Sequence, residues 1–133
     1  MNAVFADTSF YIAFVNPRDV VHVAAEEFVR GFRGKTVTTE YVLIEVGNWL
    51  ARSGDRAVFL DLMKGVRADP NTTVLGSSSA LFEAGLSLYG QRPDKMWSMT
   101  DCISFVVMKQ QRLTEALTTD HHFEQAGFRV LLR

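Results

Sequence analysis

The chain has 133 residues, of which 47% are hydrophobic and 22% are charged, with 14 Lys and Arg against 15 Asp and Glu. This length and balance fit one globular domain and exclude a disordered tail, a collagen-like chain and a disulfide miniprotein. The formal net charge of −1 argues against a basic surface that coats nucleic acid. Cys102 is the only cysteine, which excludes an internal disulfide and a zinc site built on cysteine pairs.

Short apolar runs alternate with helical patterns along the whole chain. Strands are predicted over residues 3–6, 35–38, 72–75, 115–119 and 128–132. Helices are predicted over 10–15, from a cap at Asp19 to Gly31 or Gly34, over 40–52, after Asp55, from Ser78 or Ser79 through Tyr89, over 98–111, and briefly around Phe123. Residues 90–97 are expected to form an irregular link. This alternation predicts a single α/β domain over residues 1–133, with a central, mainly parallel sheet of about four to five strands flanked by helices on both faces.

The sequence also predicts a cytoplasmic location. It contains no apolar run of the ~18 residues that a membrane span needs. Its first residues reach Asp7 before the apolar region of a signal peptide could develop. The single cysteine suits a reducing compartment as well.

Two acids come directly after predicted strands. Asp7 follows the apolar run 3–6, and Asp120 follows the run 116–119 in the same way. Ligands of parallel α/β sheets gather outside the carboxyl ends of the strands, so these two acids converge if their strands are neighbours. Each acid, taken alone, could equally begin the helix that follows it.

Two further acids lie on predicted helices. Glu45 falls at the edge of the apolar arc of helix 40–52, beside Trp49, where its carboxylate projects along the rim of the sheet or pairs with Arg52. Asp101 belongs to the segment Ser98-Met99-Thr100-Asp101, which is similar to a capping box with Asp in place of Glu. Capping alone is the more common role for such an Asp. Together, however, the four acids form a repulsive set for which a hard divalent cation is the usual remedy.

Several segments resemble the PIN domain, and most closely the VapC-type toxins of prokaryotic toxin–antitoxin pairs. The resemblance spans essentially the whole chain and rests on segments that occur in the family's order: 5–10 (FADTSF), Glu45 followed by Asn48, 98–104 (SMTDCIS) and 117–128 (LTTDHHFEQAGF). It implies a Mg²⁺- or Mn²⁺-dependent ribonuclease with Asp7, Glu45, Asp101 and Asp120 as its acidic quartet. It also implies a homodimer that a VapB-like antitoxin holds inactive by inserting a peptide near the active site.

Such a quartet suggests metal-assisted hydrolysis of RNA, with about two acids on the first ion and the others holding its waters or a second ion. Thr8, Ser9 and Thr119 are candidates to orient the acids, although helix capping explains them equally well. His121, His122, Phe10 and Trp97 are weaker candidates for substrate contact, and Asp94 fits a solvated loop. The dimer surface is expected around Phe28 and Phe59 or around Leu86 and Tyr89.

Three other functions are weighed against this one. A phosphatase that forms an aspartyl-phosphate is disfavoured, because Asp7-Thr8-Ser9 lacks a second Asp two residues on. A nucleotide-binding module is disfavoured, because neither a Gly-rich fingerprint nor a P-loop occurs. A catalytically silent PIN-like module that binds RNA or protein is the main alternative. Retention of all four acids argues against it, because a scaffold does not need a repulsive cluster.

Overall fold

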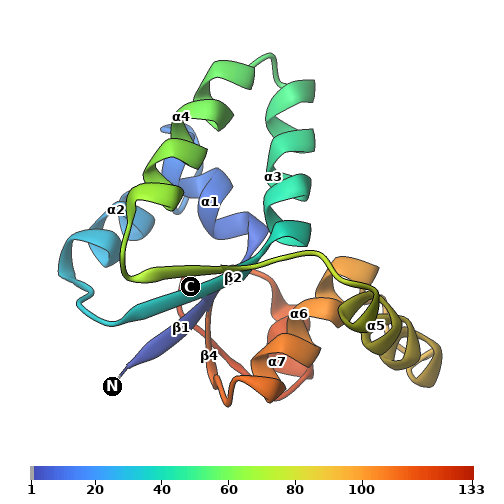
Figure 1. Cartoon of the computed structure of the whole chain (residues 1–133). Coiled ribbons are helices and arrows are strands. Elements are labelled where there is room, and N and C mark those ends of the chain that lie inside the picture. The colour runs from blue at the N-terminus through green and yellow to red at the C-terminus, as the bar shows by residue number, and fades with distance from the viewer. Residues whose placement is uncertain (1) are drawn as a thin grey trace.

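A computed structural model describes residues 2–133, and within them five strands form one parallel sheet in the order β3-β2-β1-β4-β5 (Figure 1). The strands are β1 (Ala3–Ala6), β2 (Lys35–Thr39), β3 (Thr72–Leu75), β4 (Glu115–Leu117) and β5 (Arg129–Val130). Phe5 in the central strand pairs with Val37 of β2 and Ala116 of β4. The predicted parallel sheet is thus confirmed, but β4 ends before Thr118, and β5 covers only two of the five residues expected for it.

Helices follow the strands as the alternation predicts. They are α1 (Thr8–Val15), α2 (His22–Gly31), α3 (Glu40–Arg52), α4 (Arg56–Ala68), α5 (Ser79–Gln91), α6 (Met99–Gln110) and α7 (His121–Gln125). Crossover connections between parallel strands are right-handed. The chain moves from β1 to β3 in one direction across the sheet and from β3 to β4 and β5 in the other, so the helices of these two sets of connections lie on opposite faces of the sheet. In Figure 1, α1 to α4 accordingly lie on one side of the sheet and α6 and α7 on the other. None of the helices within residues 2–133 is long and apolar enough to cross a membrane.

Helix starts depend on caps that the sequence mostly indicates. Thr39 accepts a hydrogen bond from the backbone N–H of Val42, and Ser78 accepts one from Leu81, both at 3.1 Å. Asp19 does not cap α2 as predicted, because its carboxylate accepts the N–H of Val21 and forms a turn before the helix begins at His22. The other differences between predicted and observed helix bounds are small. Helix α1 begins two residues earlier than expected, and α5 extends into the predicted link.

An aromatic cluster fixes α6 and α7 against the sheet. Phe105 of α6 packs edge-on against Phe123 of α7 with ring centroids 4.9 Å apart, and Phe123 also contacts Phe5 of β1. All three side chains are almost fully buried. Burial of each contributes roughly 1.5–3 kcal/mol to the free energy of unfolding. This packing sets where the first turns of α6 and α7, with Asp101 and Asp120, lie relative to the carboxyl end of β1.

Candidate active site

Asp7 lies at the carboxyl end of the central strand, where the connections leave for opposite faces of the sheet. Such switch points are where parallel α/β sheets bind ligands. Its backbone N–H donates to the carbonyl of Leu117 at 3.1 Å, so the ends of β1 and β4 are adjacent. The side chain is 5% exposed, and its Oδ2 accepts a 2.8 Å hydrogen bond from the hydroxyl of Thr118. Asp7 occupies the N-cap position of α1 but makes no side-chain capping bond, so capping does not explain it.

Burial raises the pKa of Asp7 to about 7. Hydrogen bonds from Thr118 and Thr8 act in the opposite direction, whereas the charges of Asp101 and Glu45 raise the pKa further. Both of these acids are therefore close enough to repel the Asp7 carboxylate.

Glu45 of α3 lies close to the same point. The hydroxyl of Thr8 donates to Oε1 of Glu45 at 2.7 Å, and Thr8 is the residue that follows Asp7. Glu45 is half-buried at the edge of the buried face formed by Val42, Val46 and Leu50, as its place on the helical wheel predicts. Its hydrogen-bond partner is thus a side chain of the site and not Arg52.

Asp101 both caps α6 and faces the other acids. Ser98 accepts the N–H of Asp101 at 3.0 Å, and Oδ2 of Asp101 accepts the N–H of Ser98 at 3.1 Å, which confirms the predicted capping box. Asp101 is nevertheless 8% exposed, and burial raises its pKa. The bond from Ser98 lowers the pKa, and the nearby charge of Asp120 raises it. The capping and site roles therefore coexist in one carboxylate.

Asp120 is the N-cap of α7, just beyond β4. Its Oδ1 accepts the N–H of His122 at 2.8 Å, and the N–H of Asp120 itself donates to the hydroxyl oxygen of Thr118 at 3.0 Å. Thr118 therefore bridges Asp7 and Asp120. Together, the contacts of Asp7, Glu45, Asp101 and Asp120 place all four predicted site residues around the carboxyl end of β1.

The four carboxylates do not form a compact cluster. Within residues 2–133, the set of three or more possible ligand atoms that lie within 4.8 Å of one another consists of Asp120, His121 and His122. The four carboxylates are spread more widely than this, which suits an ion that keeps several waters and binds one or two carboxylates directly. A hard, oxygen-binding divalent cation fits this donor set, because its charge offsets both the desolvation of the buried Asp7 carboxylate and its repulsion by Asp101 and Glu45.

Thr118 was not singled out from the sequence, and His122 was named there only as a weaker candidate for substrate contact. Thr118 is fully buried and connects two of the acids, whereas its neighbour Thr119 offers only its backbone N–H, to Ser9, among the hydrogen bonds of the site. His122 points its Nδ1 at Asp101 and Asp120, at 3.4 and 3.3 Å. The signal that the sequence offered for Thr118 was a polar residue near the end of a predicted strand. Nothing in the sequence separates His122 from His121.

Other candidates from the sequence lie outside the cluster. Phe10 and Trp97 are buried at 5% and 6% exposure, and Trp97 packs edge-on against Phe105, so both belong to the core. Asp94 pairs with the guanidinium of Arg92 through two hydrogen bonds of 3.0 Å. That exposed pair lowers the pKa of Asp94 to about 2 and confirms a solvated loop.

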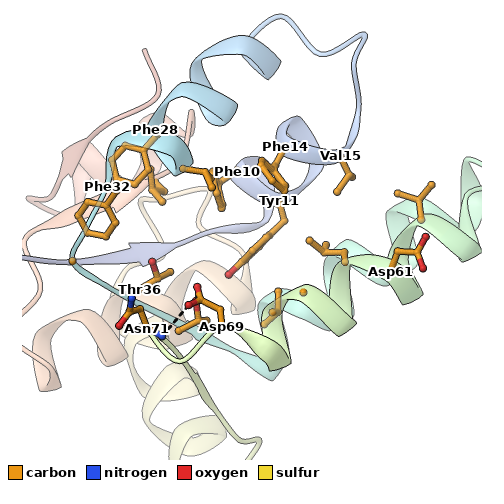
Figure 2. Close-up of a pocket in the computed structure, with 18 residues that line it drawn as sticks. Phe10, Tyr11, Phe14, Val15, Phe28, Phe32, Thr36, Asp61, Asp69 and Asn71 are labelled. Atoms are coloured by element: carbon orange, nitrogen blue, oxygen red, sulfur yellow. Dashed lines mark hydrogen bonds between the residues drawn. The ribbon is translucent and has the colours of Figure 1, made fainter.

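An aromatic cavity of about 710 Å³ opens between α1, α2 and α4 (Figure 2). Phe10, Phe14, Phe28 and Phe32 line one wall, and Asp61 and Asp69 lie on the other. None of the four acids lines this cavity. We refer to it below as the aromatic groove.

Comparison with known proteins finds VapC-type endonucleases among the relatives of this chain. The chain is 28% identical over 126 residues to the 23S rRNA-specific endonuclease VapC20 of Mycobacterium tuberculosis, covering 94% of this chain and 95% of that protein, and the same holds for the VapC20 of a second strain. The crystal structure of VapC20, described as a Sarcin-Ricin loop cleaving toxin, matches with a TM-score of 0.86 at 25% identity over 94% of this chain and 95% of that one. No family model matches the chain.

Two more distant structures share the fold. A toxin–antitoxin complex from Klebsiella pneumoniae matches with a TM-score of 0.62, over 89% of this chain and 87% of the other. FitAcB from Neisseria gonorrhoeae matches with a TM-score of 0.67, over 96% of both chains. Each is 14% identical to this chain, so these two matches bear on the fold alone.

Proposed function

We propose that the chain is a VapC-type toxin ribonuclease of the PIN-domain family, like the VapC20 proteins that it resembles over nearly its full length, and that it cleaves RNA with a divalent metal ion held by Asp7, Glu45, Asp101 and Asp120. One observation supports this proposal: acids that follow β1 and β4 and acids on α3 and α6 lie around the switch point of the sheet, with Asp7 almost fully buried. We assign this activity to the whole chain, residues 1–133, as one nuclease domain.

The site fits Mg²⁺, for which Mn²⁺ can substitute, because every quartet donor is a carboxylate oxygen. When bound, such an ion supplies charge to the phosphoryl oxygens and lowers the pKa of a water that can attack phosphorus. Asp7 is the natural central ligand, since it is the most buried of the four and is repelled by two of the others.

Neighbouring residues hold these carboxylates in place. Thr8 fixes Oε1 of Glu45, Thr118 fixes Oδ2 of Asp7, and the backbone of Ser98 fixes Oδ2 of Asp101. Hydrogen bonds of this kind orient metal ligands and raise metal affinity. Metal-assisted hydrolysis of this kind needs no side-chain nucleophile, because the attacking group is water. We expect products with 5′-phosphate and 3′-hydroxyl ends, as the family resemblance implies.

The alternative function, a catalytically silent module, is not favoured. A silent module would be expected to lack at least one of the four acids, whereas all four are present and lie around the carboxyl end of β1, which supports catalysis. The matched relatives over nearly the full chain are also named as endonucleases.

We further propose large-subunit ribosomal RNA as the substrate, by analogy with the 23S rRNA-specific relatives. A target of this kind places the action of the toxin in the cytoplasm. Because the chain carries a formal charge of −1, binding must depend on local contacts and the shape of the RNA more than on a broad positive field.

We propose the aromatic groove as the docking surface for a VapB-like antitoxin. Four Phe side chains provide an apolar wall, and Asp61 and Asp69 provide negative charge opposite it. This combination suits an amphipathic segment that carries apolar and basic side chains. Phe10 belongs to α1, the helix that begins directly after Asp7, so the groove and the site share this helix.

We also propose a homodimer formed through α5. One face of α5 packs closely on α6, where a side chain larger than hydrogen at Gly85 would collide with Ile103. Its outer face exposes Phe82, Leu86 and Tyr89, each by 44–50%. Phe28 and Phe59, the other candidates from the sequence, are packed against the core. An exposed apolar stripe of this kind is typical of an interaction surface.

The test is cleavage of purified ribosomes and of total RNA by antitoxin-free protein, in Mg²⁺, in Mn²⁺ and in EDTA. Discrete fragments that require metal are expected with the wild-type chain and are expected to vanish with Asp7→Asn. Intact RNA in every lane, from protein shown to be folded by circular dichroism, would overturn the assignment. A single cut in large-subunit RNA supports the proposed substrate, and cuts confined to other RNAs would refute it.

A further inference from the structure

The imidazole of His122 lies between two acids that come from different elements. Its Nδ1 is 3.4 Å from Oδ2 of Asp101, at the start of α6, and 3.3 Å from Oδ1 of Asp120, at the start of α7. Among residues 2–133, this nitrogen is buried and has no hydrogen-bond partner. A buried ring nitrogen without a partner is unusual and calls for an explanation.

Hydrogen bonding explains the arrangement poorly. N–H···O bonds fall mainly between about 2.7 and 3.2 Å, and both contacts of Nδ1 are longer. One ring nitrogen carries at most one hydrogen, so it cannot point well at two oxygens on different elements. Each of the two oxygens, moreover, already accepts a backbone N–H, from Ser98 and from His122 respectively.

Ligation explains the same distances well. Neighbouring ligands of an octahedral ion lie √2 times the metal–ligand distance apart, which is about 3 Å for ligands at about 2.1 Å. The two Nδ1–oxygen separations are slightly longer than this, and Asp101 lies outside the set of ligand atoms within 4.8 Å of one another, so a bound ion would draw Asp101 towards His122 and Asp120. The backbone bonds to the two carboxylate oxygens hold them in position, and each oxygen keeps lone-pair capacity for an ion.

The neighbouring histidine does not share this geometry. His121 Nδ1 is 3.8 Å from Oδ1 of Asp120, and its side chain is 63% exposed against 20% for His122. His22, the remaining histidine, bonds through Nδ1 to the carbonyl of Ala13 and faces Glu26. His122 is therefore the histidine whose nitrogen faces two acids of the site.

We propose that His122 is a nitrogen ligand, through Nδ1, of the divalent ion at the Asp101–Asp120 end of the quartet. This inference rests on the proposed function and adds a consequence for metal choice. Imidazole binds first-row transition metals better than Mg²⁺, which prefers oxygen. His122 therefore makes the site favour Mn²⁺ over Mg²⁺. The other ring nitrogen, Nε2, carries the proton in this arrangement.

The test is pulsed electron paramagnetic resonance of Mn²⁺ bound to the antitoxin-free protein. The wild-type spectrum is expected to show the modulation of a directly bound ¹⁴N nucleus, which changes to that of ¹⁵N when only the histidines are ¹⁵N-labelled. His121→Asn should keep the signal, and His122→Asn should lose it. In parallel titrations, His122→Asn is expected to weaken Mn²⁺ binding at least tenfold and Mg²⁺ binding by less than threefold.

The outcomes separate this inference from the proposed function. Bound Mn²⁺ without nitrogen modulation in the wild-type protein overturns the His122 assignment and leaves the carboxylate site standing. Signal retained in His122→Asn, or equal weakening of both metals, also overturns it. Absence of any Mn²⁺ binding to folded wild-type protein refutes both. The labelled wild-type measurement needs no variant, so it decides the matter even if His122→Asn fails to fold.

Discussion

The hydroxyl of Thr118 donates a 2.8 Å hydrogen bond to Oδ2 of Asp7 and thereby ties the end of β4 to the end of β1. The hydroxyl oxygen of Thr118 also accepts the N–H of Asp120, and the hydroxyl oxygen of Ser9 lies 3.0 Å from it. Because the hydrogen of Thr118 goes to Asp7, Ser9 is the donor in that contact. One threonine thus holds two acids of the proposed site in register.

Replacing this hydroxyl by a methyl group tests its role. Thr118→Val leaves the N–H of Asp120 and the carboxylate of Asp7 without their partner in a buried place. We expect the free energy of unfolding to fall by roughly 1–3 kcal/mol, measured by urea unfolding without metal. Thr73→Val, at an exposed position of β3, is the matched control and should change stability by less than about 0.5 kcal/mol. Equal effects of the two changes would contradict the account.

Asp7→Asn is expected to stabilise the metal-free protein while it removes metal binding. The pKa of Asp7 is raised to about 7, mainly by burial, so its charged form opposes folding once the pH rises from about 4 through 7. In EDTA at pH 8, the variant should therefore melt about 5 °C or more above the wild type. At pH 5 the gain should be smaller, because the wild-type carboxyl is already protonated in the folded state.

Bound metal should reverse the order of the melting temperatures of the wild-type protein and Asp7→Asn. Mn²⁺ is expected to raise the melting temperature of the wild-type protein, because a ligand that binds only the folded state stabilises it. Asp7→Asn should show no such rise. A variant that melts below the wild type in EDTA at pH 8, or that keeps the full Mn²⁺ effect, would contradict the placement of Asp7 at the centre of the site.

The aromatic groove offers a matched pair of valines on α2. Val29 lines the groove and is 44% exposed, whereas Val23 is 61% exposed and lies outside it. Val29→Asp should weaken capture of the cognate antitoxin at least tenfold without unfolding the chain, because it adds negative charge to an apolar wall. Val23→Asp should bind as the wild type does. Equal binding by both variants, measured by calorimetry, would exclude the groove as the docking surface.

The α5 stripe predicts the oligomeric state. Light scattering after size exclusion is expected to give a dimer for the wild-type chain and a monomer for Leu86→Glu, because the new charge would be buried between two copies. Val20→Glu, at a residue that is 99% exposed outside α5, is the control and should stay dimeric. A wild-type monomer, or a dimer that survives Leu86→Glu, would contradict the proposed interface.

The sequence predicts the individual helices and strands better than it predicts which strands lie next to one another in the sheet. Asp7 and Asp120 could be placed at strand ends from local pattern alone, but their convergence depends on β1 and β4 being adjacent. That adjacency is set by the crossover from β3 back past β1, a long-range choice that no local signal encodes. The early end of β4 has a similar origin, because Thr118 leaves the ladder to bond Asp7.

Side-chain direction limits what the sequence can say about the site. Thr118 and Thr119, or His121 and His122, are chemically identical neighbours, and only the turn into α7 decides which of each pair faces the acids. Asp101 could be identified as a cap from its spacing to Ser98, whereas its part in the cluster depends on how α6 packs against the sheet. The catalytic role of all four acids stays a prediction.

The most direct test of the central claim compares the five relevant acids one by one in ribosome cleavage. Asp7→Asn, Glu45→Gln, Asp101→Asn and Asp120→Asn each preserve size and, for Asp101 and Asp120, the capping oxygen. Each should lower the Mg²⁺-dependent cleavage rate at least a hundredfold. Asp94→Asn, which removes an exposed acid paired with Arg92, should cleave as the wild type does. Full activity in any quartet variant that remains folded would contradict the account.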